Sequence, residues 1–190
     1  MPDFPSDYQR TCRLVTSELA RTLDSIQPEQ VERLVAAITA ADRVFFVGVG
    51  RVLLSLQAVA KRWAHLGIDT HCVGEITEPA ITDRDLLIVG SGSGTTMLPL
   101  GIARKAGKLG ARVVHIGSNP QSELHEIAEF MVRIPVRTKL YLPDEIESAQ
   151  PMTSLFEQSL LLLGDIIASL LIESRQLDLK DLWQHHANLE

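Results

Sequence analysis

The sequence predicts an α/β protein built on a parallel sheet with helices on both faces. Short apolar runs alternate along the chain with longer segments of helical periodicity. Such runs are typical of strands that are buried on both faces. Two of these runs, Val44–Val47 and Leu86–Val89, end directly in glycine-containing turns. Turns of this kind occur at the edge of such sheets where ligands bind.

Two helices are expected before the sheet, within residues 5–40. The first carries Leu14, Leu19 and Leu23 at roughly helical spacing. Pro28 opens the second, whose apolar residues follow one helical face at i, i+3, i+4 and i+7: Val31, Leu34, Val35 and Ile38. We expect this pair of helices to cover a sheet or a partner subunit.

The alternating part of the chain begins at Arg43. It predicts a parallel sheet with right-handed crossovers, whose ligands bind beside the carboxyl ends of the strands. Both glycine-containing turns would lie there. Strands are expected over residues 44–47, 70–73, 86–89, 112–116 and 130–134, and helices over residues 51–66, 96–109 and 121–128.

The last third of the chain departs from this alternation. Residues 135–150 form a polar stretch with two prolines, and a loop of this length is usually a lid, a binding loop or an interface element. A long helix is expected over residues 153–174. It is apolar over more than half of its circumference, which predicts burial between the sheet and a second subunit. The tail, residues 178–190, is typical of a short helix.

Length and composition predict one domain over residues 1–190, made of N-terminal helices (1–40), an α/β core (41–174) and a C-terminal helix and tail (175–190). A chain of 190 residues that is 45% hydrophobic can bury one sizeable core. No apolar stretch approaches the ~20 residues that span a bilayer, and the N-terminus lacks the pattern of a secretion signal. We therefore expect a cytoplasmic protein without a membrane partner.

Charge and cysteine content narrow the range of partners. A formal net charge of −6 argues against a nucleic-acid partner, because nucleic-acid binders present a basic face. Cys12 and Cys72 show neither metal-ligand nor disulfide spacing and are expected to be reduced packing residues. The sequence suggests no metal site.

The strongest functional signal is the turn after the apolar run 86–89, which reads Gly-Ser-Gly-Ser-Gly-Thr-Thr over residues 90–96. Its glycines leave backbone N–H groups bare, and its serines and threonines add hydroxyl donors. A helix that begins near Thr96 would direct its unpaired N–H groups to the same point. The combination predicts a site for a phosphate group, and a flexible Gly/Ser connection is the alternative.

A second glycine-containing turn, Gly48-Val49-Gly50-Arg51, follows the first expected strand. Gly-x-Gly after a strand belongs to the dinucleotide fingerprint, and Glu75 could act as the ribose-binding acid. However, Leu53 replaces the third glycine, and a dinucleotide fold needs only one phosphate loop. Arg51 could supply positive charge to a sugar phosphate or could be an ordinary surface residue.

Glu157 is the acidic residue that could take part in catalysis. It lies in the otherwise apolar helix 153–174, where a buried carboxylate is unfavourable unless it is paired or used. A carboxylate positioned in this way can act as a general base. The alternative is an exposed glutamate on the polar edge of the helix.

The histidines carry weaker signals. His65 lies on an amphipathic segment, which is typical of a core or interface residue. Ordering of the tail residues His185 and His186 would require docking on the body of the protein or on a neighbour. The other histidines, His71, His115 and His125, show no functional pattern.

Together these segments resemble the sugar-isomerase (SIS) domain family and, within it, the 6-phospho-3-hexuloisomerases. The Ser-Gly-Ser-Gly turn is general for SIS domains, whereas the segment that begins at Gln150 and the tail are more specific. The matching stretches extend in order over nearly the whole chain: Gly48-Val49-Gly50-Arg51, Arg62-Trp63-Ala64-His65-Leu66-Gly67, Val73-Gly74-Glu75, Gly90-Ser91-Gly92-Ser93-Gly94, Gln150-Pro151-Met152-Thr153-Ser154-Leu155-Phe156-Glu157-Gln158 and His186-Ala187-Asn188-Leu189-Glu190.

The resemblance implies a five-stranded, flavodoxin-like three-layer sandwich and a homotetramer whose active sites lie near subunit interfaces. It implies a cofactor-independent interconversion of 3-hexulose 6-phosphate and fructose 6-phosphate through a cis-enediol, within the ribulose monophosphate pathway of formaldehyde. Glu157 matches the family's proposed proton acceptor, and His186 matches a C-terminal histidine that acts from an adjacent subunit. The implied substrate-binding residues are Gly48, Gly50, Arg51, Ser91, Gly92, Ser93, Gly94, Thr95 and Thr96.

Two sites depart from the family pattern. Val52 and Leu53 follow Arg51 where members often carry Ser-Gly, so a hydroxyl is absent from the pocket mouth; Ser55, one turn on, could replace it. Thr95 stands where many relatives carry glutamate. Two alternatives therefore stay open, namely isomerisation of another phosphosugar, such as an arabinose 5-phosphate type, and a non-catalytic sugar-phosphate-binding regulatory module. The absence of a helix-turn-helix pattern disfavours the second.

Overall fold

The structure, a computed structural model, describes residues 4–189, which form a five-stranded parallel sheet with helices on both faces. The fold class predicted from the sequence is confirmed. The described helices are α1 (Phe4–Asp24), α2 (Pro28–Ala40), α3 (Gly50–Ala64), α4 (Met97–Lys108) and α5 (Ser154–Ser174), with short 3-10 helices η1 (Glu123–Glu126) and η2 (Asp181–His185). The strands are β1 (Val44–Val47), β2 (Thr70–Cys72), β3 (Leu86–Gly90), β4 (Arg112–Gly117) and β5 (Phe130–Arg133).

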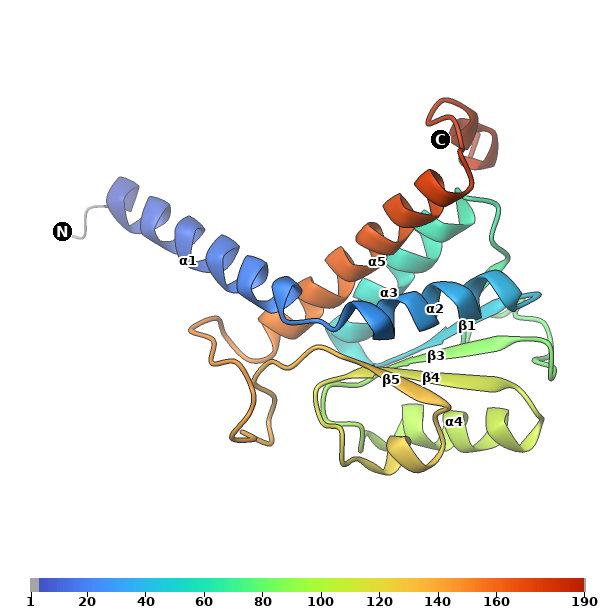
Figure 1. Cartoon of the computed structure of the whole chain (residues 1–190), viewed down its shortest axis with the longest axis horizontal. Coiled ribbons are helices and arrows are strands. Elements are labelled where there is room, and N and C mark those ends of the chain that lie inside the picture. Colours follow the sequence, from blue (N-terminus) through green and yellow to red (C-terminus); the bar gives the residue numbers. More distant parts are fainter. Residues whose placement is uncertain (1–3, 190) are drawn as a thin grey trace.

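The helices form two layers around the sheet. In Figure 1, α2, α3 and α5 cover one face of the sheet, and α4 and η1 cover the other. Successive strand residues point to opposite faces, so Phe46 joins the core under α3 and α5, whereas Phe45 joins the core above α4. Helix α1 packs its C-terminal part against α5 and projects away from the body (Figure 1).

The strand order, β2-β1-β3-β4-β5, is that of flavodoxin-like sheets. The chain runs outward from β1 to the edge strand β2 and then returns to β3 on the other side of β1. Val47, the last residue of β1, pairs with Val89 of β3. The two strands therefore end at the same level, and their glycine-containing turns are neighbours at the point where the strand order reverses.

Residues 121–128, expected to be helical, form only the 3-10 turn η1. The segment has a single fully buried apolar anchor, Leu124, and a short helix is marginal without a longer packed face. The expected helix in the tail is likewise reduced to the 3-10 segment η2.

Helix α5 corrects the expectation that no apolar stretch approaches membrane-spanning length. Its 21 residues are, by length and composition alone, apolar enough to cross a membrane, but 56% of the most apolar window is buried inside the protein. The helix packs against α3, α1 and α2. Burial within the domain therefore accounts for more than half of this apolar window.

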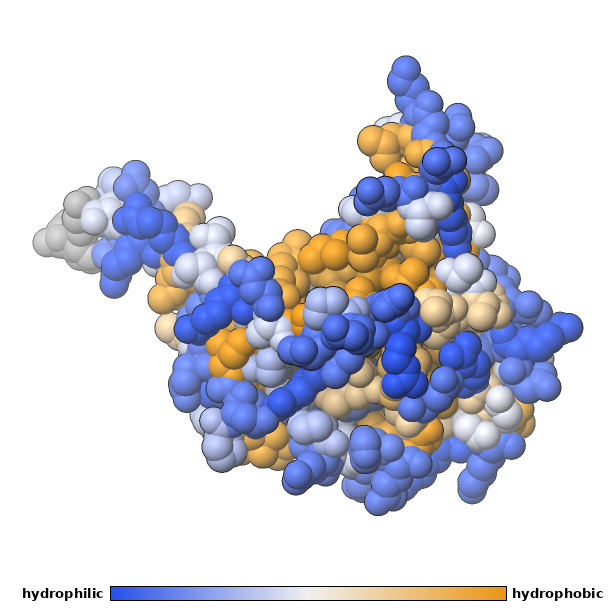
Figure 2. Space-filling model, in the orientation of Figure 1, coloured by the Kyte–Doolittle hydropathy of each residue, from blue (hydrophilic) through white to orange (hydrophobic). Residues whose placement is uncertain are grey.

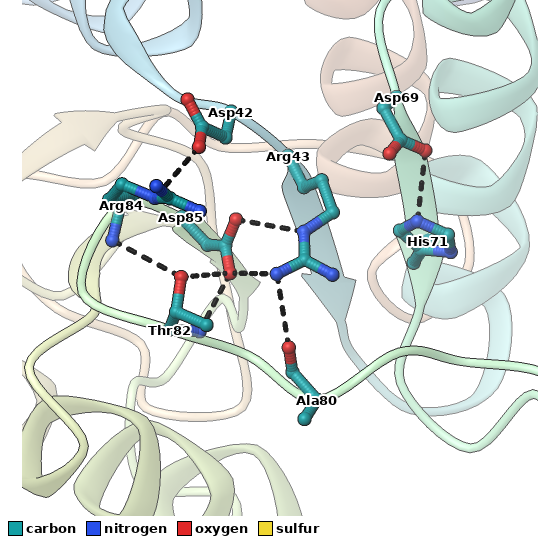
Figure 3. Close-up of polar contacts among 8 residues, drawn as sticks. All are labelled: Asp42, Arg43, Asp69, His71, Ala80, Thr82, Arg84 and Asp85. Atoms are coloured by element: carbon teal, nitrogen blue, oxygen red, sulfur yellow. Dashed lines mark hydrogen bonds and ion pairs between the residues drawn. The ribbon is translucent and has the colours of Figure 1, made fainter.

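A buried ion pair closes the edge of the sheet opposite the glycine-containing turns (Figure 3). Asp85 is fully buried, and its carboxylate accepts hydrogen bonds from Arg43 Nε at 3.0 Å and from the Thr82 hydroxyl at 2.9 Å. Arg43 also donates to the Ala80 carbonyl at 3.1 Å. Burial alone would raise the pKa of Asp85, but the bonds from Arg43 and Thr82 outweigh it and hold the pKa below its ordinary value.

We expect Arg43→Met to lower the free energy of unfolding by about 3 kcal/mol, because it leaves the Asp85 carboxylate buried without its cation. The matched control is Arg84→Met, which breaks an exposed pair with Asp42 and should change stability by at most about 0.5 kcal/mol. Urea unfolding of both variants measures the difference. Equal effects would contradict a special role for the buried pair.

Candidate active site

The turn after β3 holds successive carbonyl groups on one side of the chain. The Ser91 oxygen lies 2.8 Å from His115 Nε2, and the Gly92 oxygen accepts bonds from the N–H groups of residues 118–119 at 3.0 and 3.1 Å. In a trans peptide the C=O and the following N–H point in opposite directions. The N–H groups of Gly92 and Ser93 therefore point away from β4, and within residues 4–189 no partner is described for them.

Hydroxyl groups and a helix end add to these amides. Ser91 Oγ lies 3.4 Å from Thr96 Oγ1, and Ser93 is also buried in the turn. Thr96 is the residue that precedes α4, so the positive end of this helix dipole lies at the turn. An anion bound here would meet N–H groups, hydroxyls and the helix end together.

The turn forms one wall of a cavity of about 340 Å³. The turn after β1 and the first turn of α3 form a second wall, and the loop after β5 with the start of α5 closes the third side. The lining residues are Val49, Gly50, Arg51, Val52, Gly90, Ser91, Gly92, Ser93, Thr96, Thr138, Lys139, Met152, Thr153, Phe156 and Glu157.

Glu157 lies in this cavity, in the first turn of α5, and is only 7% exposed. Its carboxylate accepts a hydrogen bond from the Thr153 hydroxyl at 2.8 Å and forms an ion pair with Arg51 Nε. The Ser55 hydroxyl donates to the Glu157 backbone carbonyl at 2.9 Å, which ties the start of α5 to α3. The structure thus buries the acid in the cavity instead of placing it on an exposed helix edge.

Two cationic side chains reach the cavity. Arg51 comes from the first turn of α3, and its side chain is 64% exposed although it is paired with Glu157. Lys139 comes from the irregular loop after β5 and is exposed. Lys139 carried no signal in the sequence, because it belongs to no motif. Thr153 lies in the matching stretch 150–158, but the sequence assigned it no role.

The residues predicted to bind substrate divide into two groups. Gly50, Arg51, Ser91, Gly92, Ser93 and Thr96 line the cavity together with Glu157, whereas Gly48, Gly94 and Thr95 do not. Gly48 and Gly94 instead leave room for packing. A Cβ on Gly48 would lie 3.1 Å from Leu56, and one on Gly94, which has a φ of +67°, would overlap Ser122. Thr95 is exposed and lies 3.2 Å from Ser93 Oγ.

His186 lies at the opposite end of α5. Its ring stacks on that of His65 at a centroid distance of 5.2 Å, beside Trp183 and Arg62. Glu157 is in the first turn of α5, and a helix of 21 residues spans about 30 Å. Within one chain His186 is therefore remote from the cavity that holds Glu157.

His115, which showed no pattern in the sequence, lies beneath the turn. The ring is fully buried on β4, and Nδ1 has no described partner within residues 4–189. Burial lowers the pKa of His115 to about 4. The hydrogen bond with Ser91 acts in the opposite direction and raises the pKa, whereas the nearby His125 lowers it further. A carbonyl oxygen can only accept, so the proton of the neutral ring is on Nε2.

No group of three or more His, Cys, Asp or Glu side chains among residues 4–189 is arranged to hold a metal ion. A turn with unpaired N–H groups at the switch point of a flavodoxin-like sheet, with a buried carboxylate in the same cavity, agrees with the SIS-type phosphosugar isomerases that the sequence motifs resemble.

Comparison with known proteins narrows this class. No family model matches the chain. The chain is 39% identical to a 3-hexulose-6-phosphate isomerase of Mycobacterium gastri, over 97% of this chain and 92% of the relative. It is 36% identical to the enzyme of the same name from Bacillus subtilis, over 93% and 95%. The structure also superposes on the crystal structure of a Methanococcus jannaschii protein, from which a molecular function of 3-hexulose-6-phosphate isomerase was inferred. The TM-score is 0.81 at 27% identity, over 95% of this chain and 99% of that protein.

The chain therefore belongs to the 3-hexulose-6-phosphate isomerase family. The resemblance found in its motifs is confirmed by these relatives.

The shifted pKa of His115 predicts how stability depends on pH. The unfolded histidine titrates near its ordinary value of 6.5 and the folded one at about 4, so the unfolded state binds the proton first as the pH falls. The contribution of His115 is complete above pH ~6.5 and is lost towards pH ~4, with an upper limit of roughly 3 kcal/mol.

Because His115→Gln lacks this titration, the difference in unfolding free energy between the wild type and the variant should shrink as the pH falls from 7 to 4. Urea unfolding at several pH values measures it, with His185→Gln, at an exposed histidine, as a control. A difference that does not change with pH would contradict the buried neutral ring.

Proposed function

We propose that the protein is a sugar-phosphate isomerase that interconverts 3-hexulose 6-phosphate and fructose 6-phosphate through a cis-enediol. One observation carries the proposal, namely that a single cavity contains both the bare amides of the β3–α4 turn and the buried Glu157 carboxylate. The names of the relatives in Mycobacterium gastri and Bacillus subtilis support this choice of substrate.

The phosphate group of the substrate binds at the β3–α4 turn. The N–H groups of Gly92 and Ser93 and the hydroxyls of Ser91, Ser93 and Thr96 are its donors. Lys139, exposed at the mouth of the cavity, adds a positive charge to an otherwise neutral set. The remaining predicted residues, Gly48, Gly94 and Thr95, support the two turns from outside the cavity.

Glu157 transfers the proton. Its carboxylate takes the C2 proton of 3-hexulose 6-phosphate while the electrons of that C–H bond form the C2–C3 double bond and the C3 carbonyl becomes an enediolate. Return of the proton to C3 and transfer of the C2 hydroxyl proton to the C3 oxygen give the C2 ketone and the C3 hydroxyl of fructose 6-phosphate. One carboxylate serves both carbons because they are adjacent, and such catalysis contributes roughly 10²–10⁴-fold.

Arg51 changes partners during this cycle. Without substrate it is paired with the Glu157 carboxylate, which would then be a poor base. The Arg51 side chain is 64% exposed, so it can move to the phosphate or to the enediolate oxygen and release Glu157. Stabilisation of the developing oxyanion is the larger part of such catalysis.

The active form is a homotetramer with its sites near subunit interfaces. A groove of about 580 Å³ lies between α2 and α5, with Leu23, Val35 and Leu163 among its lining residues. Figure 2 shows hydrophobic residues gathered along α5 in the angle between α1 and the C-terminal segment, where Ile166 and Leu170 are 41% and 43% exposed. An adjacent subunit that covers this face also brings its His186 tail towards a neighbouring cavity.

The proposal also covers the domain organisation, the cellular location, the pathway and the partners of the protein. Residues 1–190 act as a single SIS domain, with helices 1–40, core 41–174 and tail 175–190. The protein works in the cytoplasm, in the ribulose monophosphate pathway of formaldehyde. It needs no cofactor and no metal, and it binds neither nucleic acid nor membrane.

Val52 favours one alternative, the isomerisation of another phosphosugar. Its Cγ1 lies 3.2 Å and 2.9 Å from the positions that a Cβ would take on Gly48 and Gly90, so an apolar side chain fills the space between the two turns. Ser55 donates to the Glu157 carbonyl and does not replace the missing hydroxyl. Arabinose 5-phosphate is therefore the comparison substrate in the assay below.

The wild type, supplied with ribulose 5-phosphate, formaldehyde and a 3-hexulose-6-phosphate synthase, should form fructose 6-phosphate without an added cofactor. Glu157→Gln should keep the fold and substrate binding but lose at least ~10²-fold in turnover, because an amide cannot accept the proton. Glu126→Gln, at an exposed glutamate of η1 on the other face of the sheet, is the control. Near-normal turnover of Glu157→Gln would remove this acid from the mechanism.

A complementation experiment tests the shared site. His186→Ala and Glu157→Gln should each be impaired alone, and co-expressed mixed oligomers should recover roughly a quarter or more of wild-type turnover, because some sites then contain both intact residues. The melting temperatures of both variants serve as the fold control. If mixing restores nothing while His186→Ala alone is impaired, His186 acts within its own subunit or only on the fold.

A further inference from the structure

His115 touches the phosphate turn from below and does not reach the cavity. We propose that His115 is a positioning residue of the phosphate site. By donating its Nε2–H to the Ser91 carbonyl, it holds the 91–92 peptide in the orientation that presents the Gly92 N–H to the phosphate group. The inference rests on the proposed function for the sugar, but the phosphate site can be tested without the sugar.

Two glycines leave the space in which this ring sits. A Cβ on Gly117 would lie 2.2 Å from His115 Nε2 and 2.4 Å from the Ser91 oxygen. A Cβ on Gly94 would lie 3.1 Å from His115 Cε1 and would overlap Ser122. Side chains at either position would therefore exclude the ring or break its contact with the turn.

The 91–92 peptide needs such a restraint. Besides His115, the Ser91 oxygen accepts the Gly94 N–H at 3.2 Å, which is a longer contact within the same turn. Glycine at position 92 permits backbone conformations that other residues avoid, so rotation of this peptide is opposed mainly by the two hydrogen bonds to the Ser91 oxygen. A rotated peptide would direct the Ser91 carbonyl oxygen, and not the Gly92 N–H, at a bound anion.

The chemistry of the ring suits this role. Nδ1 is buried without a described partner in residues 4–189, so a second proton there would be an unsatisfied, charged donor. The pKa of about 4 agrees with a neutral ring whose single proton is on Nε2. The bond to Ser91 therefore persists at neutral pH with a fixed donor and a fixed acceptor.

The test measures binding of inorganic phosphate by calorimetry to the full-length protein and to four variants. His115→Met, similar in size but without a donor, should bind phosphate roughly tenfold more weakly. His115→Gln, whose amide nitrogen can occupy the Nε2 position, should stay within about twofold of the wild type. Ser93→Ala should weaken binding and so locate the phosphate at the turn, while His125→Met, a change at an exposed histidine outside the cavity, should bind it normally.

Each other result overturns the proposal. Normal phosphate binding by His115→Met would show that the restraint is unnecessary, and equal losses in the Met and Gln variants would show that ring shape matters instead of the hydrogen bond. A wild type that does not bind phosphate, or does so unaffected by Ser93→Ala, would remove the phosphate site itself.

Two further measurements separate positioning from folding and from the proposed reaction. Nitrogen-15 NMR of labelled histidine in the wild type should find the Nε2–H tautomer of His115, and an Nδ1–H tautomer would refute the proposal even if the Met variant does not fold. In the isomerase assay, His115→Met should raise KM about tenfold while kcat changes less than threefold. If the wild type shows no turnover but the phosphate pattern holds, the proposed reaction fails and this inference stands.

Discussion

Parallel pairing of β1 with β3 is the constraint on which the cavity depends. The register that sets Val47 opposite Val89 ends both strands at one level, and the chain then leaves them in opposite directions, towards α3 and α4. The pairing of the strands alone therefore brings two helix N-termini and two glycine-containing turns to the same edge of the sheet, and the turns need no contact with each other. Gly90 lets Val52 and Leu56 approach the end of β3, since a Cβ there would lie 2.8 Å from Leu56 Cδ1.

Close packing of α3 on α5 then sets the position of the acid. Ser55, Val59 and Trp63 follow one face of α3 at intervals of one turn, and each meets α5. A Cβ on Gly164 would lie 2.2 Å from Val59, and Trp63 Nε1 donates to the Gly164 carbonyl at 2.9 Å. Ser55 meets the carbonyl of Glu157 two turns earlier. A larger residue at 164 would separate the helices and move the carboxylate away from the turn.

Local signals sufficed for the sheet, most clearly for β1 and β3, which are short apolar runs followed by glycine-containing turns. They failed where the outcome depends on distant contacts. Residues 121–128 have helical composition but only Leu124 as a buried anchor, so tertiary packing leaves one 3-10 turn. The pairing of Arg51 with Glu157 joins residues 106 positions apart, and the place of His115 under the turn depends on register with β3. No motif encodes either contact.

The four buried carboxylates of the described residues show why Glu157 differs from the rest. Asp85 and Glu145 each accept four hydrogen bonds, and Glu18 accepts three from the loop before α5. Most of their donors are backbone N–H groups or buried side chains that cannot leave without unfolding a segment. Glu157 has two described donors, and one of them, Arg51, is largely exposed. Glu157 is buried, but one of its partners can move away, so one carboxylate oxygen can become available to a ligand. The other three carboxylates have all their hydrogen bonds made and stabilise the loops around the cavity.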